Sequence, residues 1–223
     1  FRKVKMATFV SLISGSSGNA TFVSDGKTNL LIDCGMSGAK LKESLHAIDV
    51  MPESIDALLI THEHVDHTKG AGVISRRYNI PIYTTQGTHT SMDIGNIADE
   101  NIKIITEDTD FEIGNIGIRP FAIPHDATQP VGFNFMIGDE KYSLATDIGQ
   151  ITKSILENIT GSKKILLESN HDVEMLKCGT YPYPLKRRIL GEYGHLSNET
   201  ASKVALHLVQ NGTEHIMLGH LSK

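Results

Sequence analysis

A dense run of possible metal ligands occupies residues 62 to 67, which read HEHVDH and follow an apolar stretch that predicts a buried strand. In an extended chain, alternate side chains point to the same side, so His62 and His64 can bind one cation together. Asp66 and His67, one step further along, can then turn toward a second cation. One short loop is therefore predicted to contribute to two metal sites.

Three further residues at strand ends complete the predicted ligand set, because two cations need about seven protein ligands. They are His125, Asp147 and His220. We assign His125 to the first cation with His62 and His64, and His220 to the second with Asp66 and His67, while the Asp147 carboxylate bridges both. Taken alone, His125 and His220 also fit structural histidines, and Asp147 fits a turn aspartate.

The predicted centre suits phosphodiester hydrolysis. Two cations about 3.5 to 4 Å apart acidify a water and stabilise both the attacked and the leaving oxygen, which favours attack of a metal-bridging hydroxide on phosphorus. Imidazole and carboxylate ligands suit zinc, manganese or iron, so the metal stays open. The helical zinc-protease motif is disfavoured, because it needs a second His at position 66, where this chain has Asp66.

The composition is that of a globular protein. The chain has 223 residues, 39% of them apolar and 21% charged, and no linker, low-complexity tract or repeat divides it. No run approaches the roughly 20 apolar residues of a membrane span, and the first residues lack the apolar stretch of a signal peptide. We expect a cytoplasmic protein without a membrane partner.

Charge and cysteine content exclude further classes of protein. A net charge of −5 argues against coating nucleic acid through general basicity, although short basic clusters such as 186–188 leave room for a local groove. Two cysteines, Cys34 and Cys178, form no disulfide framework and no pair with metal-ligand spacing. The oligomeric state stays open.

The candidate residues are expected to follow strands. Strands are predicted at 7–13, 20–23, 29–32, 55–60, 80–84, 131–137, 141–145, 164–167 and 215–218, and helices at 39–45, 66–78 and from Ser197 to about Gln210. The pair 131–137 and 141–145 predicts a hairpin that delivers Asp147 to its end. In the same way, 164–167 precedes Glu168 and 215–218 precedes His220.

Over nearly the whole chain these motifs resemble the metallo-β-lactamase-fold hydrolases. The resemblance rests on the loop 62–67, on Asp33 in LIDCG upstream, and on His125, Asp147 and His220 downstream. It implies an α/β fold, a four-layer αββα sandwich with a dinuclear site at one edge. It also implies that Asp33 supports the metal loop rather than binding metal.

Three further segments resemble the YycJ (WalJ) group within this superfamily. They are residues 14–20, LESNHD at 167–172 and GHLSN at 194–198. That group is regarded as cytoplasmic metal-dependent exonucleases that act on DNA. The chain begins without Met and stops three residues after His220, so the resemblance predicts a single domain over 1–223 that lacks its C-terminal segment.

Glu168 and His195 resemble the Glu and His that the tRNA-processing branch of the superfamily pairs beside its metals. A departing alkoxide must be protonated, so we predict that Glu168 orients His195 and that His195 donates the proton. Asp66 is predicted to accept the proton of the attacking water. The alternatives are a surface ion pair for Glu168 and a helix-flanking polar role for His195.

Substrate contacts are predicted at three residues. Ser16 and Asn19 belong to the loop 14–19, whose N–H groups and hydroxyls suit a phosphate, although a plain Gly/Ser turn is the alternative. The resemblance favours phosphate. His171 is near enough to Glu168 in sequence to reach the same cleft.

The sequence therefore predicts a dinuclear metal-dependent phosphodiesterase with a nucleic acid partner, most simply a DNA exonuclease with two Zn, Mn or Fe ions. A small-molecule hydrolase is the alternative, either a cyclic or modified nucleotide phosphodiesterase or a thioesterase. A metal-stabilised binding module without turnover is a third class. Salt dependence distinguishes nucleic acid from small substrates, since several phosphate contacts make binding weaken steeply with ionic strength.

Overall fold

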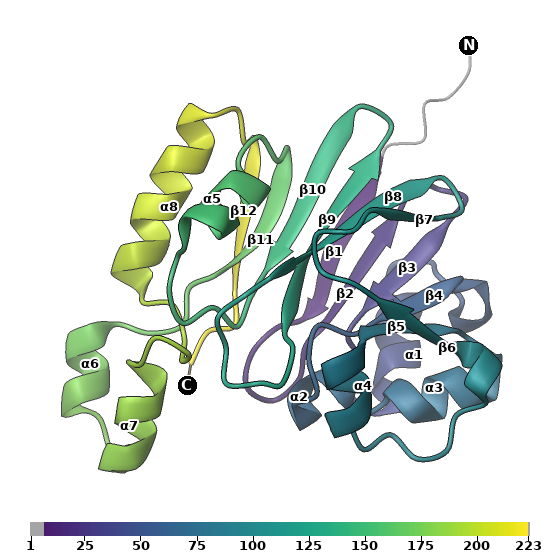
Figure 1. Ribbon diagram of the computed structural model, residues 1–223, viewed down its shortest axis with the longest axis horizontal. Helices are drawn as coiled ribbons and strands as arrows, with labels where there is room; N and C mark the ends of the chain where they lie inside the picture. The colour runs from purple at the N-terminus through teal and green to yellow at the C-terminus, as the bar shows by residue number, and fades with distance from the viewer. Residues whose placement is uncertain (1–6, 223) are drawn as a thin grey trace.

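Two facing sheets form the centre of the computed structural model, which describes residues 7–222 (Figure 1). In the described residues the first sheet has six strands in the order β1-β2-β3-β4-β5-β6. They are β1 (Thr8–Ile13), β2 (Ala20–Ser24), β3 (Asn29–Ile32), β4 (Ala57–Leu59), β5 (Ile82–Thr85) and β6 (Ile102–Ile105). β1 to β3 pair antiparallel, and β3 to β6 pair parallel.

The second sheet has the order β12-β11-β10-β9-β8-β7 in the same described residues. Its strands are β7 (Phe111–Ile113), β8 (Ile116–Ala122), β9 (Val131–Ile137), β10 (Glu140–Ala145), β11 (Lys164–Glu168) and β12 (His215–Gly219). β7 to β10 pair antiparallel, including the predicted hairpin of β9 and β10, whereas β10, β11 and β12 pair parallel.

Alternation along the strands divides the apolar side chains between two faces of each sheet. Leu30 and Ile32 of β3 pack in the core between the sheets, while Leu31 between them packs on the outer face. Phe9 and Phe135 meet across the two sheets with ring centroids 6.5 Å apart. This central core holds the sandwich together through burial of apolar area.

Helices cover both outer faces. They are α1 (Gly38–His46) and α3 (Ala71–Tyr78) on the first sheet, and α5 (Lys153–Ile159) and α8 (Asn198–Gln210) on the second (Figure 1). Leu41 and Ile74 pack against the first sheet, and Ile155 and Leu208 pack with Leu167 of the second. The predicted four-layer αββα sandwich is confirmed.

Shorter helices connect these layers, and most of them were not predicted. They are α2 (Val65–Thr68), α4 (Gln86–Ser91), α6 (Val173–Cys178), α7 (Tyr183–Ile189) and the 3₁₀ turns Pro52–Ser54 and Asp99–Asn101. The single helix predicted over 66–78 is wrong, because the chain bends at Gly70 between α2 and α3. The Gly70 N–H donates to the carbonyl of Cys34 at 2.8 Å, and a Cβ there would lie 2.2 Å from the carbonyl oxygen of Met36.

The candidate site lies at one edge of the sandwich. β8, β10, β11 and β12 all end at this edge, because β8 and β10 are both antiparallel to β9 and the last three are parallel. The loop after β4 reaches the same edge, where the Val131 N–H donates to the carbonyl of Thr61 at 3.0 Å. α6 and α7 project beside it (Figure 1).

Two predictions from the sequence concern membrane spans and signal peptides. Within residues 7–222, no helix has both the length and the apolar character that crossing a membrane requires. The segment 1–6, where a signal peptide was not expected, lies outside the described residues.

Candidate metal centre

Three histidines from two loops meet as the first predicted group. His62 and His64 come from the loop after β4, and His125 follows β8. Nε2 of His62 lies 3.0 Å from Nδ1 of His64, and Nε2 of His125 lies 3.3 Å from that same Nδ1. One nitrogen from each ring lies within 4.8 Å of the others, close enough to bind one ion.

The second predicted group also comes together. Asp66 and His67 lie in α2, and His220 follows β12. The Asp66 Oδ2 atom lies 3.6 Å from Nε2 of His67 and 3.7 Å from Nε2 of His220. His67 and His220 are buried, whereas Asp66 is partly exposed, so this group opens to solvent on the Asp66 side.

Asp147 lies between the two groups. Its Oδ1 atom is 3.8 Å from Nε2 of His125 and 3.3 Å from Nε2 of His220, and its Oδ2 atom is 3.4 Å from Nε2 of His67. Asp147 and His220 both have left-handed backbones, with φ of 58° and 56°. Such φ values are uncommon outside glycine, so the backbone is strained at both residues. This strained conformation turns their side chains inward.

Asp33 supports the loop from below the predicted ligands. Its Oδ1 atom accepts the Thr61 N–H at 2.8 Å, and its Oδ2 atom accepts the Thr61 hydroxyl at 2.9 Å and lies 2.8 Å from Nδ1 of His67. This contact orients the His67 ring with Nε2 toward the centre. The geometry agrees with the supporting role that the resemblance implied for Asp33.

Close backbone packing holds the same loop in place. Gly35 follows Asp33, and a Cβ at this position would lie 1.6 Å from the carbonyl oxygen of Asp66. The Cys34 N–H donates to the carbonyl of His67 at 2.7 Å. The end of β3 therefore contacts α2 so closely that only glycine fits at position 35.

Carboxylates control the charge of the buried imidazoles. Burial alone would lower the pKa of His67, but Asp147 and Asp33 outweigh it and raise that pKa to about 9. Burial also tends to lower the pKa of His220, but Asp147 outweighs burial and raises that pKa to about 11. Burial would raise the pKa of Asp147, yet His220 and His67 hold it well below the usual range. Without an ion, the carboxylates therefore stay ionised and favour protonated His67 and His220, so an ion that binds there would displace protons from these imidazoles.

Glu168 connects two histidines of the site. Its Oε1 atom lies 2.8 Å from Nδ1 of His195 and 3.0 Å from Nδ1 of His220. Its Oε2 atom accepts the N–H groups of Ile148 at 2.6 Å and Leu196 at 3.2 Å. Glu168 is fully buried, so the alternative of a surface ion pair is wrong. Burial would raise its pKa, but the contacts with His195 and His220 lower it.

The centre fits divalent ions. Within the described part of the chain, Oδ2 of Asp147 and Nε2 of His220 are buried without a hydrogen-bond partner, and both face other candidate donors. Buried polar atoms are normally paired, so these two unpaired atoms favour binding of a cation between them. Converging imidazoles and carboxylates suit zinc, manganese or iron.

Comparison with known proteins assigns the family. The model of the beta-lactamase superfamily domain matches residues 28–220. The chain belongs to this superfamily. It is 39% identical to the exodeoxyribonuclease WalJ of Streptococcus pneumoniae over 216 residues, which cover 95% of this chain and 80% of that relative. It is 37% identical to the exodeoxyribonuclease YycJ of Bacillus anthracis, over 96% of this chain and 82% of that relative.

A solved structure supports the fold within the superfamily. The metallo-β-lactamase-fold protein YhfI of Bacillus subtilis superposes with a TM-score of 0.73 over 96% of this chain and 86% of that one, at 16% identity. The relation to WalJ and YycJ confirms the group that residues 14–20, 167–172 and 194–198 indicated. This member of the superfamily is a metal-dependent hydrolase.

Asp126 and Arg188 lie beside the candidate metal centre, but they were not predicted from the sequence as site residues. The Asp126 Oδ1 atom lies 3.3 Å from Nε2 of His125, and both Asp126 oxygens bind the Arg188 guanidinium through Nε and Nη2. Arg188 lies in α7 and is about half exposed. Only the position of Asp126 next to His125 could have pointed to it in the sequence.

The three predicted substrate contacts occupy different surroundings. Ser16 is exposed in the turn after β1. Asn19 is buried, and its Nδ2 atom lies 2.9 Å from Nε2 of His67 and 3.3 Å from Oδ2 of Asp66. His171 is buried and lines two cavities, one that Leu221 also lines and one that His195 also lines.

Proposed function

We propose that this chain is a dinuclear metal-dependent phosphodiesterase that acts on DNA as an exonuclease. The observation that carries the proposal is the contact of 2.8 Å between Glu168 and His195 beside the predicted ligands. A thioester or a lactam needs little help for its leaving group, whereas an alkoxide leaving from phosphorus needs an acid. The names of WalJ and YycJ, exodeoxyribonucleases, support DNA as the substrate.

In this proposal seven side chains hold two ions. His62, His64 and His125 bind the first, and Asp66, His67 and His220 bind the second, with Asp147 between them. When bound, two such ions lower the pKa of a water and neutralise charge that develops on the phosphate oxygens. The interatomic distances of 3.3 to 3.8 Å from Asp147 to three imidazoles support the proposal that Asp147 would contribute to both sites.

His195 acts as the proton donor to the leaving oxygen. Nδ1 faces Glu168, so Nε2 is the nitrogen left to deliver a proton. Its side chain is 14% exposed, which gives a substrate access to it. Asp66 is partly exposed at the mouth of the centre and accepts the proton of the attacking water.

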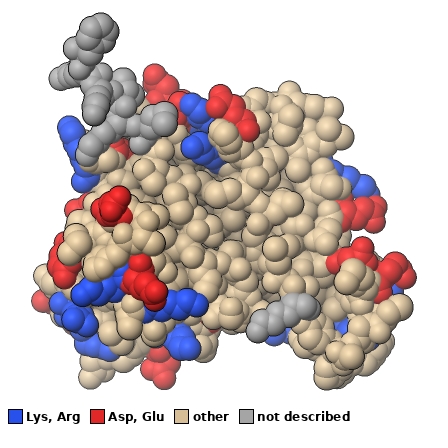
Figure 2. Space-filling view, turned by 180° about the vertical axis from the view of Figure 1, so that it is seen from behind, with Lys and Arg blue, Asp and Glu red and all other residues tan. Residues whose placement is uncertain are grey.

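Arg188 supplies a positive charge to the phosphate backbone at the same mouth. Its bidentate ion pair with Asp126 holds the guanidinium beside His125. Ser16 and the backbone of the loop 14–19 offer further donors to phosphate. On the face shown in Figure 2, Lys and Arg side chains gather mainly on the side of α1 and α3, mixed with acidic ones. We therefore expect the phosphate contacts to lie at the mouth of the centre rather than on this face.

The small-molecule alternative is tested by substrate preference. Purified protein with Mn²⁺ or Zn²⁺ is assayed on single-stranded DNA, on a cyclic nucleotide, on a small aryl phosphodiester and on an aryl thioester, from 50 to about 300 mM salt. We expect kcat/KM to be highest for DNA and to fall steeply with salt for DNA alone. Equal or higher kcat/KM for the cyclic nucleotide or the thioester, without salt dependence, rejects the nuclease proposal.

A further inference from the structure

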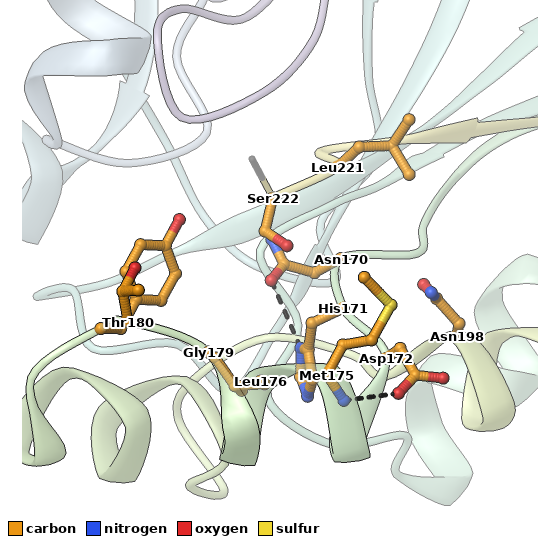
Figure 3. Close-up of a pocket in the computed structure, with 11 residues that line it drawn as sticks. Asn170, His171, Asp172, Met175, Leu176, Gly179, Thr180, Asn198, Leu221 and Ser222 are labelled. Atoms are coloured by element: carbon orange, nitrogen blue, oxygen red, sulfur yellow. Dashed lines mark hydrogen bonds between the residues drawn. The ribbon is translucent and has the colours of Figure 1, made fainter.

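A cavity of about 350 Å³ lies next to the candidate metal centre, between the end of β12 and α6 (Figure 3). Its walls come from the loop after β11, from α6 and the segment that follows it, from the start of α8 and from the residues after His220. Sites for small organic ligands occupy about 300 to 1,000 Å³, so this cavity has room for one such group rather than for a length of polymer.

Asn170 connects the cavity to the centre. Its Nδ2 atom donates to the carbonyl of His220 at 2.7 Å and lies 3.3 Å from Nδ1 of the same histidine. The Ser222 N–H in turn donates to the carbonyl of Asn170 at 2.8 Å. A group held in the cavity therefore lies beside Leu221, the residue that directly follows the candidate metal ligand His220 in the chain.

The lining favours a neutral flat group over a phosphate. Met175, Leu176 and Leu221 provide apolar surface, while the amide side chains of Asn170 and Asn198 are hydrogen-bonded within the protein. Among the described residues that line the cavity none is Lys or Arg, and Asp172 contributes a carboxylate. An anion would be repelled there, whereas a nucleobase combines apolar faces with hydrogen-bonding edges.

His171, which lines this cavity and a second one beside His195, carries an unused acceptor. Asn170 turns its Nδ2 toward His220, so its Oδ1 faces Nδ1 of His171 at 3.3 Å and requires a proton on that nitrogen. The Nε2 atom is then an acceptor, and among residues 7–222 it is buried without a partner, in a side chain only 4% exposed. Burial lowers the pKa of His171, which keeps the ring neutral.

We propose that this cavity binds one nucleobase of the DNA strand, next to the phosphodiester that is cleaved. The base packs against Met175 and Leu221 and presents an amino or ring N–H group to Nε2 of His171. This inference rests on the proposed nuclease function and adds to it a contact that reads the base rather than the backbone. Bases in all four nucleotides carry such faces and donors, so the contact favours an intact base without demanding one sequence.

The test compares end-labelled DNA with and without a base at single positions near the cleaved end. An abasic residue is placed at the first, second or third nucleotide, and kcat/KM is measured with the metal-loaded protein. We expect one abasic position to lower kcat/KM on the order of ten-fold and the other positions to have smaller effects. Equal kcat/KM for all abasic positions overturns the proposal that the cavity binds a base. Failure to cleave any of the DNA substrates overturns the proposed function instead.

Two variants assign the effect to the cavity. His171→Leu removes the acceptor at constant bulk, and Met175→Ala removes apolar surface from a side chain that is 76% exposed and so contributes little to folding. Both are expected to bring the ratio of intact to abasic kcat/KM toward one. His215→Leu, an exposed histidine on β12, is the matched control and keeps the wild-type ratio. An unchanged ratio in both cavity variants contradicts the proposal.

Discussion

The Oε1 atom of Glu168 lies 2.8 Å from Nδ1 of His195, and this one oxygen also lies 3.0 Å from His220. The proposed proton donor and a proposed metal ligand thus depend on the same buried carboxylate. Because Glu168 also accepts two backbone N–H groups, four contacts fix the position of its carboxylate. Replacing His195 should therefore remove the proposed proton donor alone. Replacing Glu168 should disturb both that donor and the proposed metal ligand His220.

Replacing His195 tests the proton donor. His195→Ala should lower kcat by about 10² to 10⁴-fold, because the leaving oxygen loses its acid, while both ions stay bound. Metal content measured by plasma mass spectrometry should equal that of the wild type and of the control His215→Ala. Loss of an ion from His195→Ala would show that His195 is a ligand instead.

Replacing Glu168 should affect both turnover and metal affinity. Glu168→Gln removes the charge that orients His195 and His220, so kcat should fall, and affinity for the second ion should weaken by about 10 to 100-fold. A competition titration with a chelating dye measures that affinity. Unchanged affinity would mean that His220 does not need Glu168 to bind metal.

Asp33→Asn tests the support of the metal loop. His67 loses the carboxylate that orients its Nδ1, and we expect metal affinity to weaken by about 10 to 100-fold while the fold persists. The same titration, together with circular dichroism, separates these outcomes. Wild-type affinity in this variant would remove Asp33 from the account, and the exposed Asp139→Asn serves as the control.

Removal of metal should lower thermal stability. Ions that bind only the folded state stabilise it by about 2.7 kcal/mol at a hundred times Kd. We expect EDTA to lower Tm, and added Mn²⁺ or Zn²⁺ to restore it, as followed by differential scanning calorimetry. A Tm that does not respond to either treatment would contradict ion binding by the buried histidines.

Arg188→Ala tests the phosphate contact at the mouth. We expect KM for DNA to rise and the slope of log affinity against log salt to decrease by about one, as one phosphate contact is lost. Arg119→Ala is the matched control, because Arg119, which lies on β8, makes a similar bidentate pair with Asp110. An identical salt slope in both variants would exclude Arg188 from the substrate path.

The sequence predicts that the seven candidate ligands lie together, because each follows a strand, and the structure brings them to one edge of the sandwich. His62 and His220 are 158 residues apart, yet both follow strands that end at one edge. The continuous apolar run from Leu30 to Ile32 predicts a buried strand, whereas the arrangement of the strands in two facing sheets was implied only by the family resemblance.

Other features depend on tertiary contacts that have no local signal. The break at Gly70 arises because its backbone packs against residues 34 and 36, whereas the apolar pattern around it continues as in one helix. Asp126 and Arg188 are 62 residues apart, and nothing near either residue indicates the other. The α6 and α7 segment carries exposed Met175 and Tyr183, so its apolar pattern is too weak to predict helices.

Degradation of end-labelled DNA by metal-loaded protein, beside an Asp147→Ala control, tests the central claim most directly. Single- and double-stranded DNA and RNA are incubated with Mn²⁺ or Zn²⁺, and products are resolved at single-nucleotide resolution. The account predicts stepwise loss of nucleotides from one end of DNA and none with Asp147→Ala. Intact DNA after incubation with folded, metal-loaded protein, or equal cleavage by Asp147→Ala, would contradict it.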